Sequence, residues 1–170
     1  MRYEAYESLL DHRIRNAWVC PMQLYLISLL TMHQLYNLYL DPMNFSSVAQ
    51  RLYVQPISNT ILVRTTISYQ LRAAAEAELL KYGSVIDVND LYSEADKAFD
   101  ALSILLGGDQ WFFGGETPTL FDASVFAYTQ LLLDEKMGWK EKRLVRAIRK
   151  RENLVRHRER LLVRYFDNDE

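Results

Sequence analysis

The sequence predicts an all-α domain built around one central apolar helix, and three observations favour this fold class. Apolar residues recur at helical spacing along most of the chain. The 170 residues are 49% hydrophobic with a formal charge of −2, which is enough to form one compact core without a metal or a disulfide. The segment from Thr119 to Leu133 is apolar around nearly all of its helical circumference, which is typical of a helix in the middle of a domain.

The start of this central helix carries a predicted N-terminal cap formed by Thr119 and Asp122. The Thr119 side chain can accept a hydrogen bond from a backbone N–H of the first turn, and Asp122 occupies the capping-box position three residues later. The Asp122 carboxylate also faces the positive end of the helix dipole. Pro118 prevents a helix from continuing in from upstream. We therefore predict a structural role for Thr119 and Asp122 rather than a catalytic one.

The chain begins with a predicted amphipathic helix, in which apolar residues from Tyr6 to Trp18 recur at helical spacing. No Asp, Glu, Lys or Arg occurs from Ala17 to Leu40, a length that could suggest a membrane span. Pro21, His33 and several side-chain amides interrupt this segment, and polar groups are costly in lipid. We therefore interpret it as a core or membrane-contacting segment.

Part of this segment, Val19–Gln34, is interpreted as either a retained intron or a true insertion. When it is removed, Trp18 joins Leu35 and the helical period continues, because Leu38 becomes the fourth residue after Trp18. The codons at its start can contain a splice donor, and those near its end can contain a branch site and an acceptor. The alternative is an apolar insertion that docks on a partner or a membrane.

Residues 41–67 are predicted to hold one helix followed by a loop. The Asp-Pro-Met-Asn turn at residues 41–44 leads into a helix that carries Phe45 and Val48 and ends at Gln55-Pro56. The segment Ile57–Ile67 is rich in Thr, Ile and Val, so a strand is a possible interpretation. We predict a loop here instead.

Two longer helices are predicted before the central one. The Ala-rich segment Tyr69–Tyr82 has high helix propensity, and Gly83 is expected to close it. The next helix is expected to begin at Asn89 or Asp90 and to end at Gly107-Gly108.

Basic residues concentrate near the C-terminal end. Residues Lys140–Arg164 contain eleven Lys or Arg and three Glu, so the near-neutral total hides a basic end. Arg156, Arg160 and Arg164 share one predicted helix face. A solvated polar face is the simplest interpretation, and a surface that binds an anionic membrane or an acidic partner is the alternative. Nucleic acid is not expected as a partner, because no aromatic residues interleave with these arginines on that face.

The sequence shows no catalytic or metal-binding constellation. Cys20 is the single cysteine, which excludes a disulfide or a Cys-rich zinc site within the chain. His12, His33 and His157 are scattered without ligand spacing, so we expect each of them at the surface or partly buried. No nucleophile or metalloprotease motif occurs. We therefore expect a non-enzymatic protein with no cofactor and no metal.

The order of these features resembles the C-terminal domain of glutathione transferases and, more narrowly, the metaxin family built on that fold. A central apolar helix entered through a Thr-x-x-Asp box is the feature shared with the wider fold. The segments that resemble metaxins are Ala5–Leu10, Leu91–Ala95, Ala101–Gly107, Phe112–Gly114, Leu120–Tyr128 and Glu152–Phe166. The resemblance implies a glutathione-transferase C-terminal-like helical bundle around the central helix, and we expect residues 1–170 to form one such domain.

The metaxin resemblance implies an adaptor function at the cytosolic face of the mitochondrial outer membrane. The expected partners are subunits of the sorting and assembly machinery, namely its β-barrel subunit and a second metaxin-like subunit. Family members carry a thioredoxin-like domain before the helical one, and we expect this chain to lack it and to have no transferase activity. Membrane association is expected to be peripheral. The alternative function is that of a divergent glutathione transferase or a transferase-like soluble binding module.

Overall fold

The computed structural model describes residues 31–81 and 84–166, and within these ranges the chain forms helices and no β-strand. The predicted all-α fold class is therefore confirmed. The predicted helix at Tyr6–Trp18 and most of Val19–Gln34 lie outside the described residues. The labelled elements are η1 (Tyr36–Leu40), α2 (Pro42–Asn44), η2 (Phe45–Val54), α3 (Ile61–Leu79), α4 (Val88–Leu106), η3 (Phe112–Gly114), α5 (Leu120–Leu133), η4 (Glu135–Met137), α6 (Arg143–Arg149) and α7 (Glu152–Tyr165).

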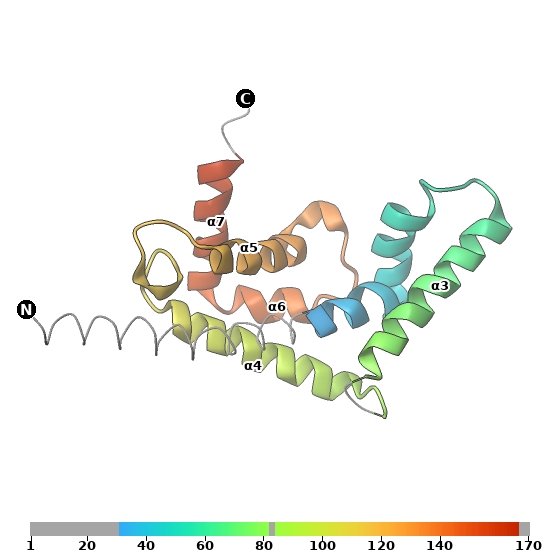
Figure 1. Cartoon of the computed structure of the whole chain (residues 1–170), viewed down its shortest axis with the longest axis horizontal. Coiled ribbons are helices and arrows are strands. Elements are labelled where there is room, and N and C mark those ends of the chain that lie inside the picture. Colours follow the sequence, from blue (N-terminus) through green and yellow to red (C-terminus); the bar gives the residue numbers. More distant parts are fainter. Residues whose placement is uncertain (1–30, 82–83, 167–170) are drawn as a thin grey trace, which may run out of the picture.

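Helices α4 to α7 form the main bundle (Figure 1). Both α4 and α5 pack against α6 and α7. Side chains from all four helices meet in one apolar core, which supplies most of the driving force for folding. Its fully buried members include Phe99, Leu102, Leu106, Val125, Ile148 and Leu154.

The central apolar helix, α5, is buried along one face rather than on every side. Phe121, Val125 and Leu132 lie in the core. Leu120 is 85% exposed and Ala123 is also exposed. The prediction of a helix buried all round is therefore wrong, because neighbouring helices cover only part of its apolar circumference.

Helix α3 begins at Ile61, so the loop predicted over Ile57–Ile67 is wrong for most of its length. The prediction rested on the modest helix propensity of β-branched residues. In the structure, the hydroxyl groups of Thr65 and Thr66 donate to the backbone oxygens of Ile61 and Leu62, each at 3.0 Å. The polar groups of these residues are thus satisfied within the helix itself.

Two further predicted helix boundaries, the end of α3 and the start of α4, also differ from the structure. Helix α3 ends at Leu79, short of the predicted end at Tyr82, which lies outside the described residues. The cap of α4 is Asp87, whose carboxylate accepts the backbone N–H groups of Asn89 and Asp90 at 2.8 and 3.2 Å. Asn89 and Asp90 therefore belong to the first turn of α4 and do not start the helix.

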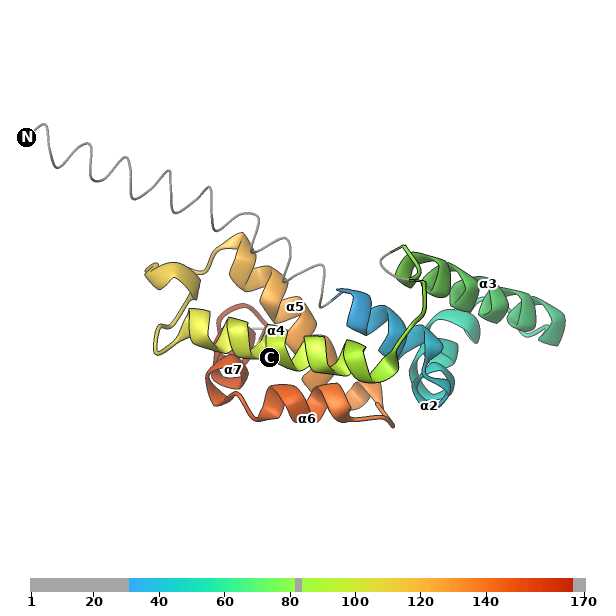
Figure 2. The same cartoon turned by 90° about the horizontal axis from the view of Figure 1, so that it is seen from below.

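Segment η2 and helix α3 form an arm that projects from the α4–α7 bundle (Figures 1 and 2). Helix α3 packs against η1 and η2, and only Ala75 and Leu79 among its residues are buried. The bundle therefore leaves most of the surface of α3 uncovered.

Asn44 fastens the base of this arm to the bundle. Its buried side-chain amide donates to Oδ1 of Asn37 at 2.9 Å and to the backbone oxygen of Glu141 at 3.3 Å. Its Oδ1 accepts the backbone N–H groups of Lys140 and Glu141 at 2.8 and 3.0 Å. The amide group thus uses its full hydrogen-bonding capacity to join η1 and α2 to the chain that precedes α6.

Candidate functional site

Asp122 is fully buried, and its carboxylate accepts four hydrogen bonds from three segments of the chain. Thr119 and Asp122 form a capping box at the start of α5. Oδ2 of Asp122 accepts the backbone N–H of Thr119 at 2.8 Å and its hydroxyl at 2.7 Å. Oδ1 accepts the backbone N–H of Phe112 at 2.9 Å and lies 2.8 Å from Nε2 of His157. Asp122 therefore joins the turn before α5 and helix α7 to the start of α5.

A tight turn before α5 brings the Phe112 N–H to this carboxylate. Phe113 and Gly114 have φ angles of +67° and +66°. The left-handed conformation is unfavourable for phenylalanine, and packing against α5 offsets its cost. The rings of Phe112 and Phe113 lie 4.8 and 5.4 Å from the ring of Phe121, measured between centroids.

His157 is fully buried and His33 is also buried, so the expectation of a surface or partly buried side chain is wrong for both, and His12 lies outside the described residues. Its ring meets the rings of Trp111 and Phe112 edge-on, at centroid distances of 5.9 and 5.1 Å. Helix α7 buries one face that carries Leu154, His157 and Leu161. This spacing of three and four residues is the sequence signal that indicates a buried histidine.

Asp122 is held in its ionised form by its surroundings. Burial raises the pKa of Asp122, but the hydrogen bonds from His157, Thr119 and Phe112 outweigh it and hold the pKa below the ordinary value of 3.8. Asp122 and His157 are both sealed from solvent, so a substrate cannot reach them. Within the described residues no cluster of three or more His, Cys, Asp or Glu side chains could hold a metal. The geometry of this pair fits a structural role.

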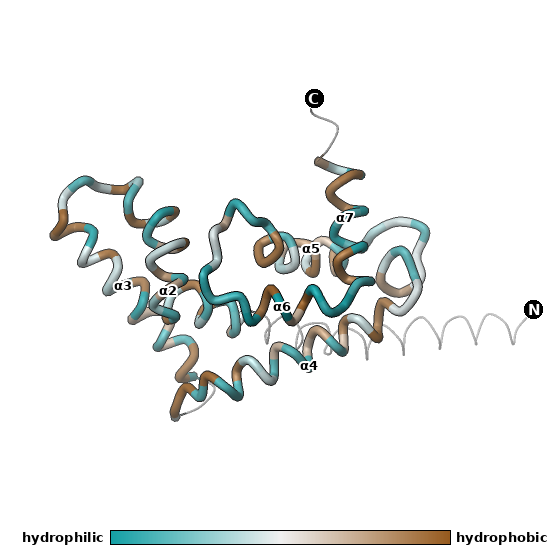
Figure 3. The backbone as a smooth tube through the Cα atoms, turned by 180° about the vertical axis from the view of Figure 1, so that it is seen from behind, coloured by the Kyte–Doolittle hydropathy of each residue, from teal (hydrophilic) through white to brown (hydrophobic). Residues whose placement is uncertain are grey.

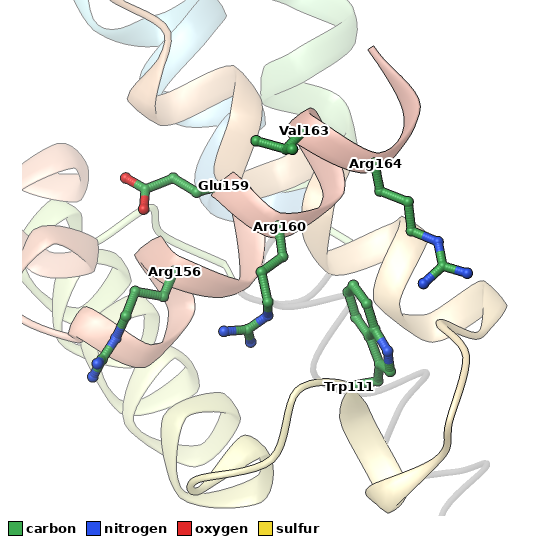
Figure 4. Close-up of a pocket in the computed structure, with 6 residues that line it drawn as sticks. All are labelled: Trp111, Arg156, Glu159, Arg160, Val163 and Arg164. Atoms are coloured by element: carbon green, nitrogen blue, oxygen red, sulfur yellow. The ribbon is translucent and has the colours of Figure 1, made fainter. Parts of the chain in front are cut away.

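A groove of about 550 Å³ opens beside this buried pair, between α7 and Trp111 (Figure 4). Arg160 and Arg164 extend from α7 toward Trp111, whereas Arg156 points away from it. The predicted basic face thus lines one groove, but only two of its three arginines approach the indole. The lining residues are Trp111, Arg156, Glu159, Arg160, Val163 and Arg164.

The indole of Trp111 is the apolar floor under these arginines. The guanidinium carbons of Arg160 and Arg164 each lie 5.7 Å from the Trp111 ring centroid, within the range of a cation–π interaction. Arg160 also donates to the backbone oxygen of Gln110 at 2.8 Å. Trp111 lies far from the arginines along the chain, so no local sequence pattern indicates that it joins them.

Two buried donors at the groove lack a hydrogen-bond partner within the described part of the chain, namely Nε1 of Trp111 and Nε of Arg160. Both atoms are buried, so an acceptor could pair with them only if the surrounding side chains moved. Burial lowers the pKa of Arg160, and the positive charge of Arg156 lowers it further. Chemically, the groove can hold an anionic group above an apolar surface.

The α4–α7 bundle and its Thr119–Asp122 box define an all-α fold of the glutathione-transferase C-terminal type. Residues 95–161 match the family model described as glutathione S-transferase, C-terminal domain. This match runs from α4 to near the end of α7 and includes Asp122, His157 and Trp111, whereas α3 lies outside it. The chain has no match among curated protein sequences.

We expect Asp122→Ala to lower the free energy of unfolding by about 3–5 kcal/mol, because it removes the acceptor for buried donors of Phe112, Thr119 and His157. Thr119→Ala should cost only about 1 kcal/mol, the usual effect of losing an N-cap side chain. Urea denaturation of both variants measures these changes. Equal losses from the two variants would contradict the view that Asp122 does more than cap α5.

The stabilisation by Asp122 should also depend on pH in a defined direction. The pKa of Asp122 is lower in the folded chain than its ordinary value of 3.8, so its contribution is complete above that value and is lost as the pH falls through the folded-state pKa. The difference in unfolding free energy between wild type and Asp122→Asn should therefore shrink with acidification. Urea titrations over a range of acidic pH values test this, and a difference that grows would contradict it.

Proposed function

We propose that this protein is a non-enzymatic, metaxin-like adaptor that supports protein import and β-barrel insertion at the cytosolic face of the mitochondrial outer membrane. Its partners would be the β-barrel subunit and a second metaxin-like subunit of the sorting and assembly machinery. The match to the glutathione S-transferase C-terminal domain supports the fold on which this proposal depends. The resemblance of the sequence motifs to metaxins supports the narrower assignment.

The groove over Trp111 is the observation that supports an adaptor role most directly. It combines an exposed basic rim with an apolar floor formed by Trp111. An acidic segment of a partner with a neighbouring apolar side chain would complement both features. The carboxylate of Glu159 points away from Arg160 and Arg164 in Figure 4, so it leaves their charge available to an anion, whereas Arg156 lies 3.8 Å from the carboxylate of Glu152.

We also propose that the protein is located peripherally at the membrane. Within the described residues, none of the helices combines the length and the apolar character that crossing a bilayer requires. We propose that the adaptor contacts the membrane peripherally, through a partner or through a surface contact.

Charge reversal at the rim of the groove should weaken partner binding. Arg156 and Arg164 are exposed, so Arg156→Glu with Arg164→Glu should preserve the fold while leaving Arg160 bound to Gln110. We expect affinity purification from mitochondria to recover less of the β-barrel subunit, and the remaining binding to be less sensitive to salt. Arg146→Glu is the matched control, because this side chain is 68% exposed on α6 and does not line the groove.

Equal recovery with the groove variant and with wild type would contradict a role of the groove in partner binding. Recovery of only soluble proteins by the wild type would favour the alternative, a divergent glutathione transferase or a transferase-like soluble binding module. Calorimetry with glutathione and a conjugation assay separate these two forms of the alternative. We expect neither saturable glutathione binding nor activity.

A further inference from the structure

The free end of the arm exposes a cluster of large apolar side chains, which we call the arm tip. It consists of Ile57, Ile61 and Leu62. Ile61 and Leu62 are each 78% exposed, and Tyr69, about two turns further along α3, is 74% exposed. Figure 3 shows the outer end of α3 in the colour of hydrophobic residues. Several large apolar side chains exposed at one end of a helix indicate an interaction site.

The segment that carries the arm tip contains basic residues but no acidic ones. Residues 42–75 contain no Asp or Glu, but they contain Arg51, Arg64 and Arg72. Arg51 donates to backbone oxygens of the bundle, and Glu76 and Glu78 lie near the other end of α3. The outer part of the arm is therefore weakly positive, with Arg64 beside the arm tip. A positive, apolar surface attracts an anionic one, and it repels a second copy of itself.

Several polar side chains near the arm tip are paired within the arm, which lowers the cost of moving them out of water, although Thr60 at the N-cap of α3 makes no side-chain cap hydrogen bond. The hydroxyls of Thr65 and Thr66 donate to backbone oxygens one turn earlier, at 3.0 Å. The guanidinium group of Arg64 donates to the backbone oxygen of Ser58 and to Oδ1 of Asn59, the latter at 3.3 Å. Such pairing matters most at a lipid interface, where unpaired polar groups are expensive.

The tip is also a free end rather than a groove. Figures 1 and 2 show the outer end of α3 and the preceding loop projecting away from α4–α7. A projecting apolar end can enter a bilayer, whose headgroup region deforms around it. Tyr69 supplies the kind of aromatic ring that favours the membrane–water interface.

We propose that the arm tip inserts into the interface of an anionic lipid bilayer, with the side chains of Ile61 and Leu62 reaching the acyl chains and Arg64 near the headgroups. This assigns membrane contact to the arm instead of the basic face of α7. This inference does not rest on the proposed adaptor function. The residues proposed to contact lipid belong to the arm, and none of them lines the groove over Trp111.

Vesicle flotation tests this proposal with the full chain. Wild type should bind phosphatidylcholine vesicles that contain phosphatidylserine, bind pure phosphatidylcholine less, and dissociate as salt rises. Ile61→Glu with Leu62→Glu should reduce binding about tenfold or more, because two apolar side chains lose their burial in lipid. Circular dichroism should show an unchanged fold, since both side chains are exposed in wild type.

Two matched variants serve as controls. Ile104→Glu removes an equally exposed side chain, 81% accessible, near the C-terminal end of α4. Arg156→Glu with Arg164→Glu removes charge from the groove. Both variants should bind anionic vesicles as wild type does, so the membrane test and the partner test can fail independently.

Insertion can be observed directly at the tip. The arm contains no tryptophan, so Leu62→Trp introduces a local fluorescent reporter. Its emission should shift to the blue on anionic vesicles and should be quenched by lipids brominated along their acyl chains. Ile104→Trp should show neither change on the same vesicles.

Four results would overturn the proposal. One is a wild-type protein that fails to bind anionic vesicles, and another is an equal loss of binding for the tip variant and Ile104→Glu. A third is loss of vesicle binding only in the groove variant, which would place membrane contact on α7. A concentration-dependent dimer that the tip substitutions abolish, without vesicle binding, would identify a second copy as the occupant and would also overturn it.

Discussion

The buried carboxylate of Asp122 is the interaction on which the arrangement of the bundle depends. A buried charge is tolerated only when its hydrogen bonds are complete. Asp122 obtains them from Thr119, Phe112 and His157, which belong to the start of α5, the preceding turn and α7. Displacing any one of these segments would leave charge or buried donors unpaired. The carboxylate therefore favours one relative placement of all three segments over alternatives that bury similar apolar area.

The groove is a consequence of the same placement. His157 packs edge-on against Trp111 and brings α7 over the turn that carries the indole. Arg160 and Arg164 extend from α7 at the next turns, so their guanidinium groups reach the indole ring. A structural bond in the interior thereby sets the geometry of a surface that can recognise an anion. The arm has a separate attachment through Asn44, which explains how it can present its own surface independently.

Local sequence signals identified some of these features, and contacts distant in sequence decided the rest. The spacing of Thr119 and Asp122 is a local pattern, and it predicted the start of α5. The contact of Asp122 with His157 joins residues far apart in the chain, and no local pattern specifies it. Helix α3 was misjudged over its first turns, because β-branched residues have modest helix propensity and their pairing of hydroxyls with the helix backbone was not anticipated.

A double-mutant cycle between Asp122 and His157 tests the central claim most directly. Asp122→Asn and His157→Phe keep the approximate shapes of both side chains, and urea unfolding of wild type, both single variants and the double variant gives their coupling energy. If the buried pair couples α5 to α7, the coupling should be about 1–3 kcal/mol. Effects of the two substitutions that add within about 0.5 kcal/mol would contradict the account.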